Sequence, residues 1–159
     1  MIKLNPFSSI FITILNFIKR KIHFPKTFND QKLKMEDNHE FEIFRHVIIG
    51  EKNDLPNNGA IFIVRFKLDN MSIEKNKRFS RFPIPMFIGL PGFRAKFWMC
   101  NEQTGFNQGI YQWESEKDAE NYSKSFAVKF MTSRSEPKSV SYEIIPNKNI
   151  YEFFEEKKL

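Results

Sequence analysis

The sequence predicts an α+β domain, and three observations support this prediction. Runs in which every second residue is apolar indicate strands, and segments with capping residues and a helical spacing of apolar residues indicate helices. From residue 60 onward these elements follow one another in the order β-α-β-β-α-β. The chain has 159 residues, the size of one domain, and can bury a core without a disulfide or a metal.

The first strand and helix lie directly after a turn-rich loop. Residues 60–68 (AIFIVRFKL) predict a strand with one wholly apolar face and one mixed face. Residues 70–82 predict a helix that Asn70 or Ser72 caps and that two following prolines end. Residues 86–93 then form an apolar connector to the next strand.

Residues 93–101 (FRAKFWMCN) predict the second strand of the domain. Strict alternation along this strand places Phe93, Ala95 and Phe97 on one face, which we expect to pack against the helices. The opposite face then carries a guanidinium, an ammonium and an indole: Arg94, Lys96 and Trp98.

The remaining elements complete the order. A hairpin turn leads into a third strand at residues 106–114, and Ser115 with Asp118 gives a capping-box-like start to a helix that continues to residue 130. Residues 139–145 predict the last strand, and residues 149–158 predict a short amphipathic helix.

This order is that of a ferredoxin-like plait, an antiparallel sheet with both helices on one face. The helices would cover the apolar face, so the mixed face must meet water or another surface. It holds too much apolar area to stay wet, and a second sheet is the simplest cover. We therefore expect a homodimer in which two sheets face each other. The apolar residues expected on that face are Ile61, Ile63, Trp98 and Ile145.

Residues 1–24 predict an added amphipathic helix, with Asn5 as its cap. It ends in the basic run KRK at residues 19–21 and is too short to span a bilayer. Either residues 6–22 contact an anionic membrane surface, or the apolar stripe packs on its own domain or on a partner. The stripe consists of Phe7, Ile10, Phe11, Ile14, Leu15 and Ile18.

The domain division that follows is an N-terminal helix (1–24), a linker with a possible extra strand (25–58) and the main domain (59–159). The net charge of +6 raises nucleic acid as a partner, but 25 basic residues stand among 19 acidic ones, which is typical of a solvated surface. A lone cysteine, Cys100, fits a reducing compartment, and three dispersed histidines give no metal-ligand spacing. We expect no metal, no flavin and a cytoplasmic location, with membrane association as an open alternative.

Several spaced motifs resemble a known family. They are PGFRAKFW at residues 91–98, Gly109-Ile110-Tyr111, and the helix start from Ser115 to Tyr122. These stretches resemble the YdhR-type mono-oxygenases, part of the antibiotic-biosynthesis mono-oxygenase-like, dimeric α/β-barrel proteins. The resemblance covers roughly residues 60–146. It implies a plait that dimerises through its sheets, and an oxygenase that oxidises phenolic or quinol substrates without metal or flavin.

Such an oxygenase needs an apolar pocket, a group that stabilises the substrate anion and exclusion of water. The candidate catalytic residues are Arg94, Lys96 and Trp98. The candidate substrate-binding residues are Phe82, Met86, Phe93, Tyr111 and Trp113, and Phe87 could also wall the pocket.

Each of these residues also has an ordinary structural role available. The tryptophans are typical core or interface residues, and Arg94 or Lys96 could form ion pairs with Glu114 or Glu143. A non-catalytic dimeric module that binds a hydrophobic small molecule or a membrane therefore stays an alternative. A heme-binding or heme-degrading protein is a weaker one, since neither predicted plait helix contains a histidine.

Overall fold

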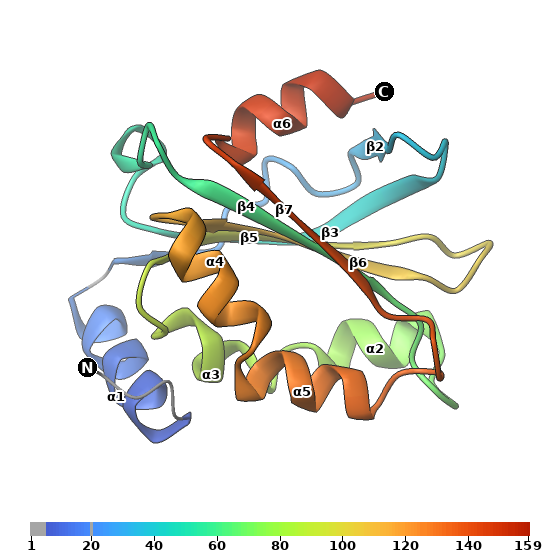
Figure 1. Ribbon diagram of the computed structural model, residues 1–159, viewed down its shortest axis with the longest axis horizontal. Coiled ribbons are helices and arrows are strands. Elements are labelled where there is room, and N and C mark those ends of the chain that lie inside the picture. Colours follow the sequence, from blue (N-terminus) through green and yellow to red (C-terminus); the bar gives the residue numbers. More distant parts are fainter. Residues whose placement is uncertain (1–5, 20) are drawn as a thin grey trace.

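In the computed structural model, which describes residues 6–19 and 21–159, the chain forms one seven-stranded antiparallel sheet with helices on both faces (Figure 1). The strand order is β1-β3-β5-β6-β4-β7, and β2 pairs with β3 beside this path. The strands are β1 (Ile22–His23), β2 (Lys32–Lys34), β3 (Glu40–Ile49), β4 (Ala60–Phe66), β5 (Phe93–Cys100), β6 (Asn107–Trp113) and β7 (Ser141–Pro146).

Six α-helices and one short 3₁₀ turn accompany the sheet in the described part of the chain. They are α1 (Pro6–Ile18), the 3₁₀ turn η1 (Lys52–Asp54), α2 (Ile73–Phe79), α3 (Ile84–Ile88), α4 (Glu116–Ser123), α5 (Phe126–Ser133) and α6 (Ile150–Lys157). The run β5-β6-β4-β7 is the four-stranded core expected of a β-α-β-β-α-β chain, so the predicted α+β, ferredoxin-like fold is confirmed.

The sheet separates two apolar cores. Helices α2, α3, α4 and α5 cover one face, while α6 and β2 lie over the other (Figure 1). Phe62 and Val64 of β4 point into the core on the side of α2–α5, as predicted from alternation. Ile61 and Ile63 point into the core under α6. We call these two sides the helix face and the α6 face.

The predicted orientation of β5 is wrong, and a β-bulge is the reason. Phe93 pairs with Trp113 while Ala95 pairs with the preceding Gln112, so one extra residue, Arg94, interrupts the alternation. Downstream of the bulge every side chain lies on the face opposite to the one expected from strict alternation. Lys96 contacts Phe87 and Tyr111 on the helix face, and Trp98 belongs to the same core. Ala95 and Phe97 pack under α6 instead.

The α6 face is covered in large part by the chain itself. The predicted C-terminal helix forms as α6 and buries Ile150, Phe153 and Phe154 against the sheet. The predicted linker contributes β2, the long strand β3 and the ring of Phe28 to the same core. Lys96 and Trp98 therefore cannot face a partner subunit, and the predicted homodimer would have to use other surface.

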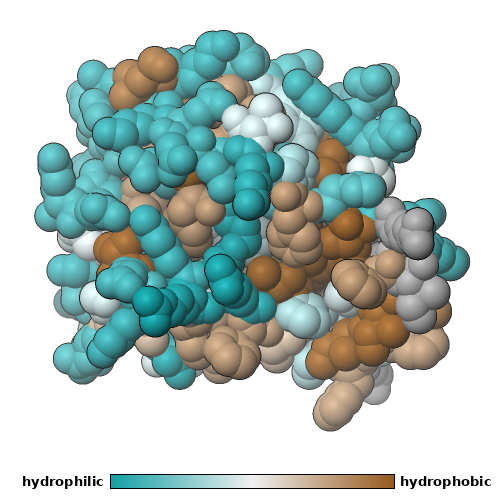
Figure 2. Space-filling view, turned by 180° about the vertical axis from the view of Figure 1, so that it is seen from behind, coloured by the Kyte–Doolittle hydropathy of each residue, from teal (hydrophilic) through white to brown (hydrophobic). Residues whose placement is uncertain are grey.

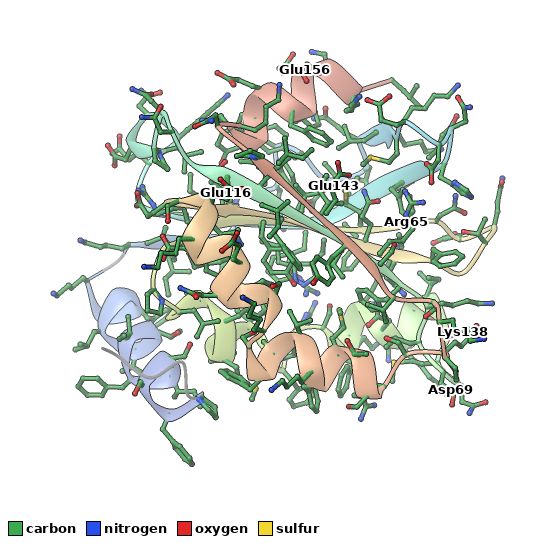
Figure 3. All side chains as sticks on the ribbon, in the orientation of Figure 1. Arg65, Asp69, Glu116, Lys138, Glu143 and Glu156 are labelled. Carbon is green, nitrogen blue, oxygen red and sulfur yellow. The ribbon has the colours of Figure 1, made fainter. Side chains whose placement is uncertain are left out.

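The polar part of the α6 face lies toward β7. Arg65 and Glu143 project from β4 and β7 on this side of the sheet (Figure 3). Arg65 pairs with Asp37 from the loop after β2 and lies over the ring of Phe41. This region remains accessible to solvent in the single chain.

Two further differences from the predicted elements come from local sequence. The helix predicted from Ser115 to residue 130 is two helices, because Ser125 caps a new one by accepting a hydrogen bond from the Val128 amide. Ser115 caps α4 through the Asp118 amide and Ser72 caps α2, as predicted. The connector that precedes β5 contains the short helix α3.

Helix α1 packs on α3 through its small polar residues. Thr13 donates a hydrogen bond of 2.9 Å to the carbonyl oxygen of Pro85, and Ser9 lies 3.4 Å from the same oxygen. Gly89 permits the close approach, because a Cβ there would lie 1.9 Å from the Ser9 carbonyl oxygen. The predicted cap Asn5 lies outside the described residues.

Candidate functional site

A cavity of about 70 Å³ lies between the sheet and the helices on the helix face. Strands β5 and β6 form its floor, and α2, α4 and α5 with the residues around α3 form its walls. Its lining is apolar and aromatic apart from a few polar groups that converge on it. Those polar groups are Asn76, Ser80, Lys96, Tyr111, Tyr122 and Arg134.

Lys96 is the central polar group of the cavity. Its amine lies 2.6 Å from the hydroxyl of Tyr111, its direct neighbour across the β5–β6 ladder. The amine also lies 4.5, 4.3 and 4.2 Å from the ring centroids of Phe87, Trp98 and Tyr111. Burial, with a smaller contribution from the positive charge of Arg45, holds the pKa of Lys96 well below its ordinary value. This environment favours the neutral amine.

Two tyrosines, Tyr111 and Tyr122, line the wall of the cavity next to Lys96. The rings of Tyr111 and Tyr122 lie 4.9 Å apart between centroids, and their hydroxyls interact with each other. Burial raises the pKa of both phenols, so both keep their protons at neutral pH. Gly109 leaves room for this arrangement, since a Cβ there would lie 2.8 Å from the Tyr111 ring.

The mouth of the cavity lies between α2 and α5. Phe79 and Phe130 stack with their centroids 6.4 Å apart, and Arg134 lies over the Phe79 ring at 4.3 Å. Phe130 is 40% exposed, which places it at the outer rim. Behind the wall, Arg45 donates to the Ser80 hydroxyl and to the Lys77 carbonyl oxygen, which fixes the end of α2.

The structure brings four of the residues predicted from the sequence to this cavity: Phe87, Lys96, Trp98 and Tyr111. Phe93 and Trp113 are buried behind it and pack against Tyr111. The bulged Arg94 lies away from the cavity. It forms an ion pair with Glu114, which was the structural alternative considered from the sequence.

Other predicted site residues lie on or near the surface. Phe82 is 77% exposed and Met86 is half-buried, and neither lines the cavity, although Phe87 does. Sequence reasoning missed Asn76 and Tyr122 as site residues. Tyr122 was visible as part of an inward stripe, but only the packing of α4 on the sheet places its hydroxyl beside Tyr111.

His46 lies on the other face of the sheet. Its Nε2 is 3.0 Å from the Tyr151 hydroxyl of α6, and burial lowers its pKa to about 4. Within residues 6–19 and 21–159, no three His, Cys, Asp or Glu side chains gather closely enough to hold a metal ion.

Comparison with solved structures places this geometry among ferredoxin-fold proteins. An uncharacterized ferredoxin fold protein from Listeria monocytogenes, related to antibiotic biosynthesis monooxygenases, aligns with a TM-score of 0.54 and 13% identity. That alignment covers 73% of this chain and 69% of that one. A monooxygenase-like protein from Listeria innocua aligns with a TM-score of 0.52 and 15% identity, over 69% of this chain and 65% of that chain, slightly less than two thirds of its length.

These similarities show the fold, and at such identities they show no more than the fold. No family model matches the chain, and no curated protein matches its sequence. The class that fold and cavity define is therefore a ferredoxin-like α+β domain of the architecture seen in monooxygenase-related proteins, with an aromatic cavity between the sheet and the helices. The more specific YdhR-type assignment stays a prediction.

Proposed function

We propose that the protein is a cofactor-independent monooxygenase that acts on a hydrophobic phenol or quinol. The observation that carries this proposal is a buried lysine in an aromatic cavity, with its amine 2.6 Å from a tyrosine hydroxyl. A neutral amine with no carboxylate beside it is a base, and the phenolic proton of a bound substrate is the proton it could accept. The sequence alone offered no obvious base.

The proposed chemistry begins with this proton transfer. The Lys96 amine takes the hydroxyl proton of the substrate, and the resulting ammonium stabilises the phenolate, which is electron-rich enough to react with O₂. For an anthrone-like substrate, one oxygen atom becomes the new ring carbonyl. With the substrate in its enol form, the other oxygen leaves as water with the one hydrogen of the oxidised carbon and the proton that Lys96 returns, so the substrate supplies all the electrons and the amine is regenerated.

The other residues of the cavity support the same substrate class. Trp98 and Tyr111 offer ring faces on which a flat aromatic molecule could stack. The apolar walls exclude water from the reactive intermediate. At about 70 Å³ the cavity is smaller than the apolar cavity of about 150 Å³ that holds benzene. Binding of an aromatic substrate therefore requires the mouth between Phe79 and Phe130 to open, and these rings border solvent.

Oxygen uptake with a panel of hydroquinones and anthrones tests the proposal. We expect turnover that a chelator leaves unchanged and that Lys96→Met lowers by roughly 10²- to 10⁴-fold, the usual contribution of a general base. Binding of the substrate, measured by quenching of tryptophan fluorescence, should change only a few-fold. Arg94→Met is the matched control, because Arg94 lies outside the cavity.

Two results would count against the proposal. Equal rates for the wild type and Lys96→Met would exclude the lysine as the base. Tight binding of panel members with no oxygen uptake would instead favour the alternative function, a module that binds hydrophobic small molecules without converting them.

A further inference from the structure

Helix α1 presents an apolar face to solvent. The helix uses Ser9 and Thr13, both buried, for its contact with α3. Its largest apolar side chains point away from the domain: Phe7, Phe11 and Phe17 are 83%, 62% and 72% exposed. A surface helix of a globular domain normally buries its apolar stripe and exposes its polar residues. The arrangement here is the reverse.

The apolar area extends over the whole outer side of the helix. Ile14 and Leu15 are exposed as well, at 51% and 38%. Figure 2 shows hydrophobic residues gathered at the corner of the molecule where α1 lies. Two more phenylalanines are exposed: Phe82, two residues before α3, and Phe24, which follows β1. Such a contiguous apolar surface marks an interaction site.

Every charged residue in the segment that carries α1, up to Asp30, is basic. The first acidic residue of the chain is Asp30, whereas the segment before it holds Lys19, Lys21 and Lys26 among its basic residues. Lys19 and Lys21 follow α1 directly and are exposed. Arg81, next to Phe82, adds a further exposed cation. An apolar face flanked by basic residues complements a surface that has an apolar interior and anionic groups at its boundary with water.

The length of α1 limits how it can meet a bilayer. Its 13 residues span about 20 Å, less than the hydrocarbon core. Among the described residues no helix has the length and apolarity required to cross a membrane. The contact available to α1 is therefore one in which the helix lies in the plane of the interface with its phenylalanines among the acyl chains.

We propose that the exposed face of α1 docks on an anionic lipid surface. A second copy of the chain fits this face less well, because a symmetric contact presents the same segment, which has no acidic residue before Asp30 to pair with these lysines. Anionic headgroups neutralise those lysines, and the acyl region takes up the apolar side chains. This inference is independent of the proposed oxygenase chemistry.

Sedimentation with vesicles tests the proposal on the full chain. We expect the protein to pellet with vesicles of phosphatidylcholine mixed with phosphatidylglycerol, and far less with phosphatidylcholine alone. Phe7→Ser combined with Phe11→Ser should weaken binding by more than roughly tenfold. Lys21→Glu should weaken it by roughly tenfold, and added salt should mimic that loss. Leu159→Ser and Lys34→Glu, which change an exposed leucine and an exposed lysine elsewhere, are the matched controls.

A second readout reports on insertion itself. Both native tryptophans are buried, at 5% and 1% exposure, so a Phe11→Trp variant adds a probe on α1 alone. Its emission should shift to the blue with anionic vesicles and be quenched by brominated acyl chains. Circular dichroism confirms that each variant is folded.

Three results would overturn the proposal. They are the absence of wild-type protein from the pellet with anionic vesicles, equal binding by the wild type and the Phe7/Phe11 variant, and self-association that Phe11→Ser abolishes. The last result would assign the face to a second copy of the chain.

Discussion

At the residue scale, Arg94 decides which side of the sheet Lys96 faces. Because Arg94 occupies a bulge, Phe93, Lys96 and Trp98 share the helix face. Arg94 itself is drawn outward to Glu114, with Nη1 2.6 Å from Oε1. A bulge changes the face of every later residue in its strand, so this one residue moves the lysine from the α6 face to the aromatic cavity on the helix face.

The buried lysine predicts a pH dependence of stability. Lys96 has a pKa near 10.4 in the unfolded chain and a much lower one in the fold, so between these values the unfolded state binds more protons. The free energy of unfolding therefore falls as pH falls through this window. Relative to Lys96→Met, the wild type should lose about 1.4 kcal/mol for each pH unit below about 10.4, and the loss should level off at the folded-state pKa.

Urea unfolding of both proteins across this pH range measures the difference. All other titrating groups are shared, so the difference isolates Lys96. Lys34→Met, which removes an exposed lysine, is the matched control. A constant difference for Lys96→Met would mean that Lys96 stays charged in the fold.

At the element scale, serine caps fix where the helices begin. Ser72 and Ser115 cap α2 and α4 and were recognisable from their positions before helical segments. Ser125 caps a second helix, α5, and this helix places Phe130 at the mouth of the cavity. The sequence contained this cap, but its helical stripe continues across Ser125, so periodicity gave no sign of the break.

The α1–α3 contact predicts which substitution loosens α1 from the domain. Gly89→Ala adds a methyl group that would lie 1.9 Å from the Ser9 carbonyl oxygen, so α1 must move away from α3. Gly89 has a negative φ of −83°, which alanine adopts without backbone strain. We therefore expect faster hydrogen exchange in α1 with little change in the rest of the domain.

Thr13→Val is a milder change at the same contact. It removes the hydrogen bond to the Pro85 carbonyl oxygen but keeps the volume, and should cost about 1 kcal/mol of local stability. If Gly89→Ala leaves the hydrogen-exchange rates of α1 unchanged, the close contact with α3 does not hold this helix on the domain.

At the scale of the whole molecule, one chain covers most of both faces of its sheet. The helical layer covers one face, and α6 with the segment around β2 covers much of the other. A homodimer remains a prediction from the sequence and its family resemblance. In the single chain, the surface available for it includes the edge strand β7, where Tyr142 is 56% exposed, and the solvent-accessible region around Arg65.

Equilibrium sedimentation tests this prediction at micromolar concentration. We expect a mass of twice the 19.0 kDa of one chain, and replacement of Tyr142 by a charged residue (Tyr142→Glu) should shift it toward the single chain, because a charge on an apolar contact is costly. Phe11→Ser should leave the mass unchanged, since Phe11 belongs to α1, which packs on α3 and not on β7. A single-chain mass for the wild type would contradict the dimer.

The sequence by itself determined the β-α-β-β-α-β order, the caps Ser72 and Ser115 and the apolar face of β4, because these depend on residues close together in the chain. It also marked Lys96, Trp98 and Tyr111 as candidates. Only the tertiary structure decided which face they share, since the bulge at Arg94 depends on pairing with β6. It likewise decided that Tyr122 meets Tyr111 and that α1 turns its phenylalanines outward. Those outcomes depend on how distant segments pack, and a packing partner far along the chain leaves no periodic signal in local sequence.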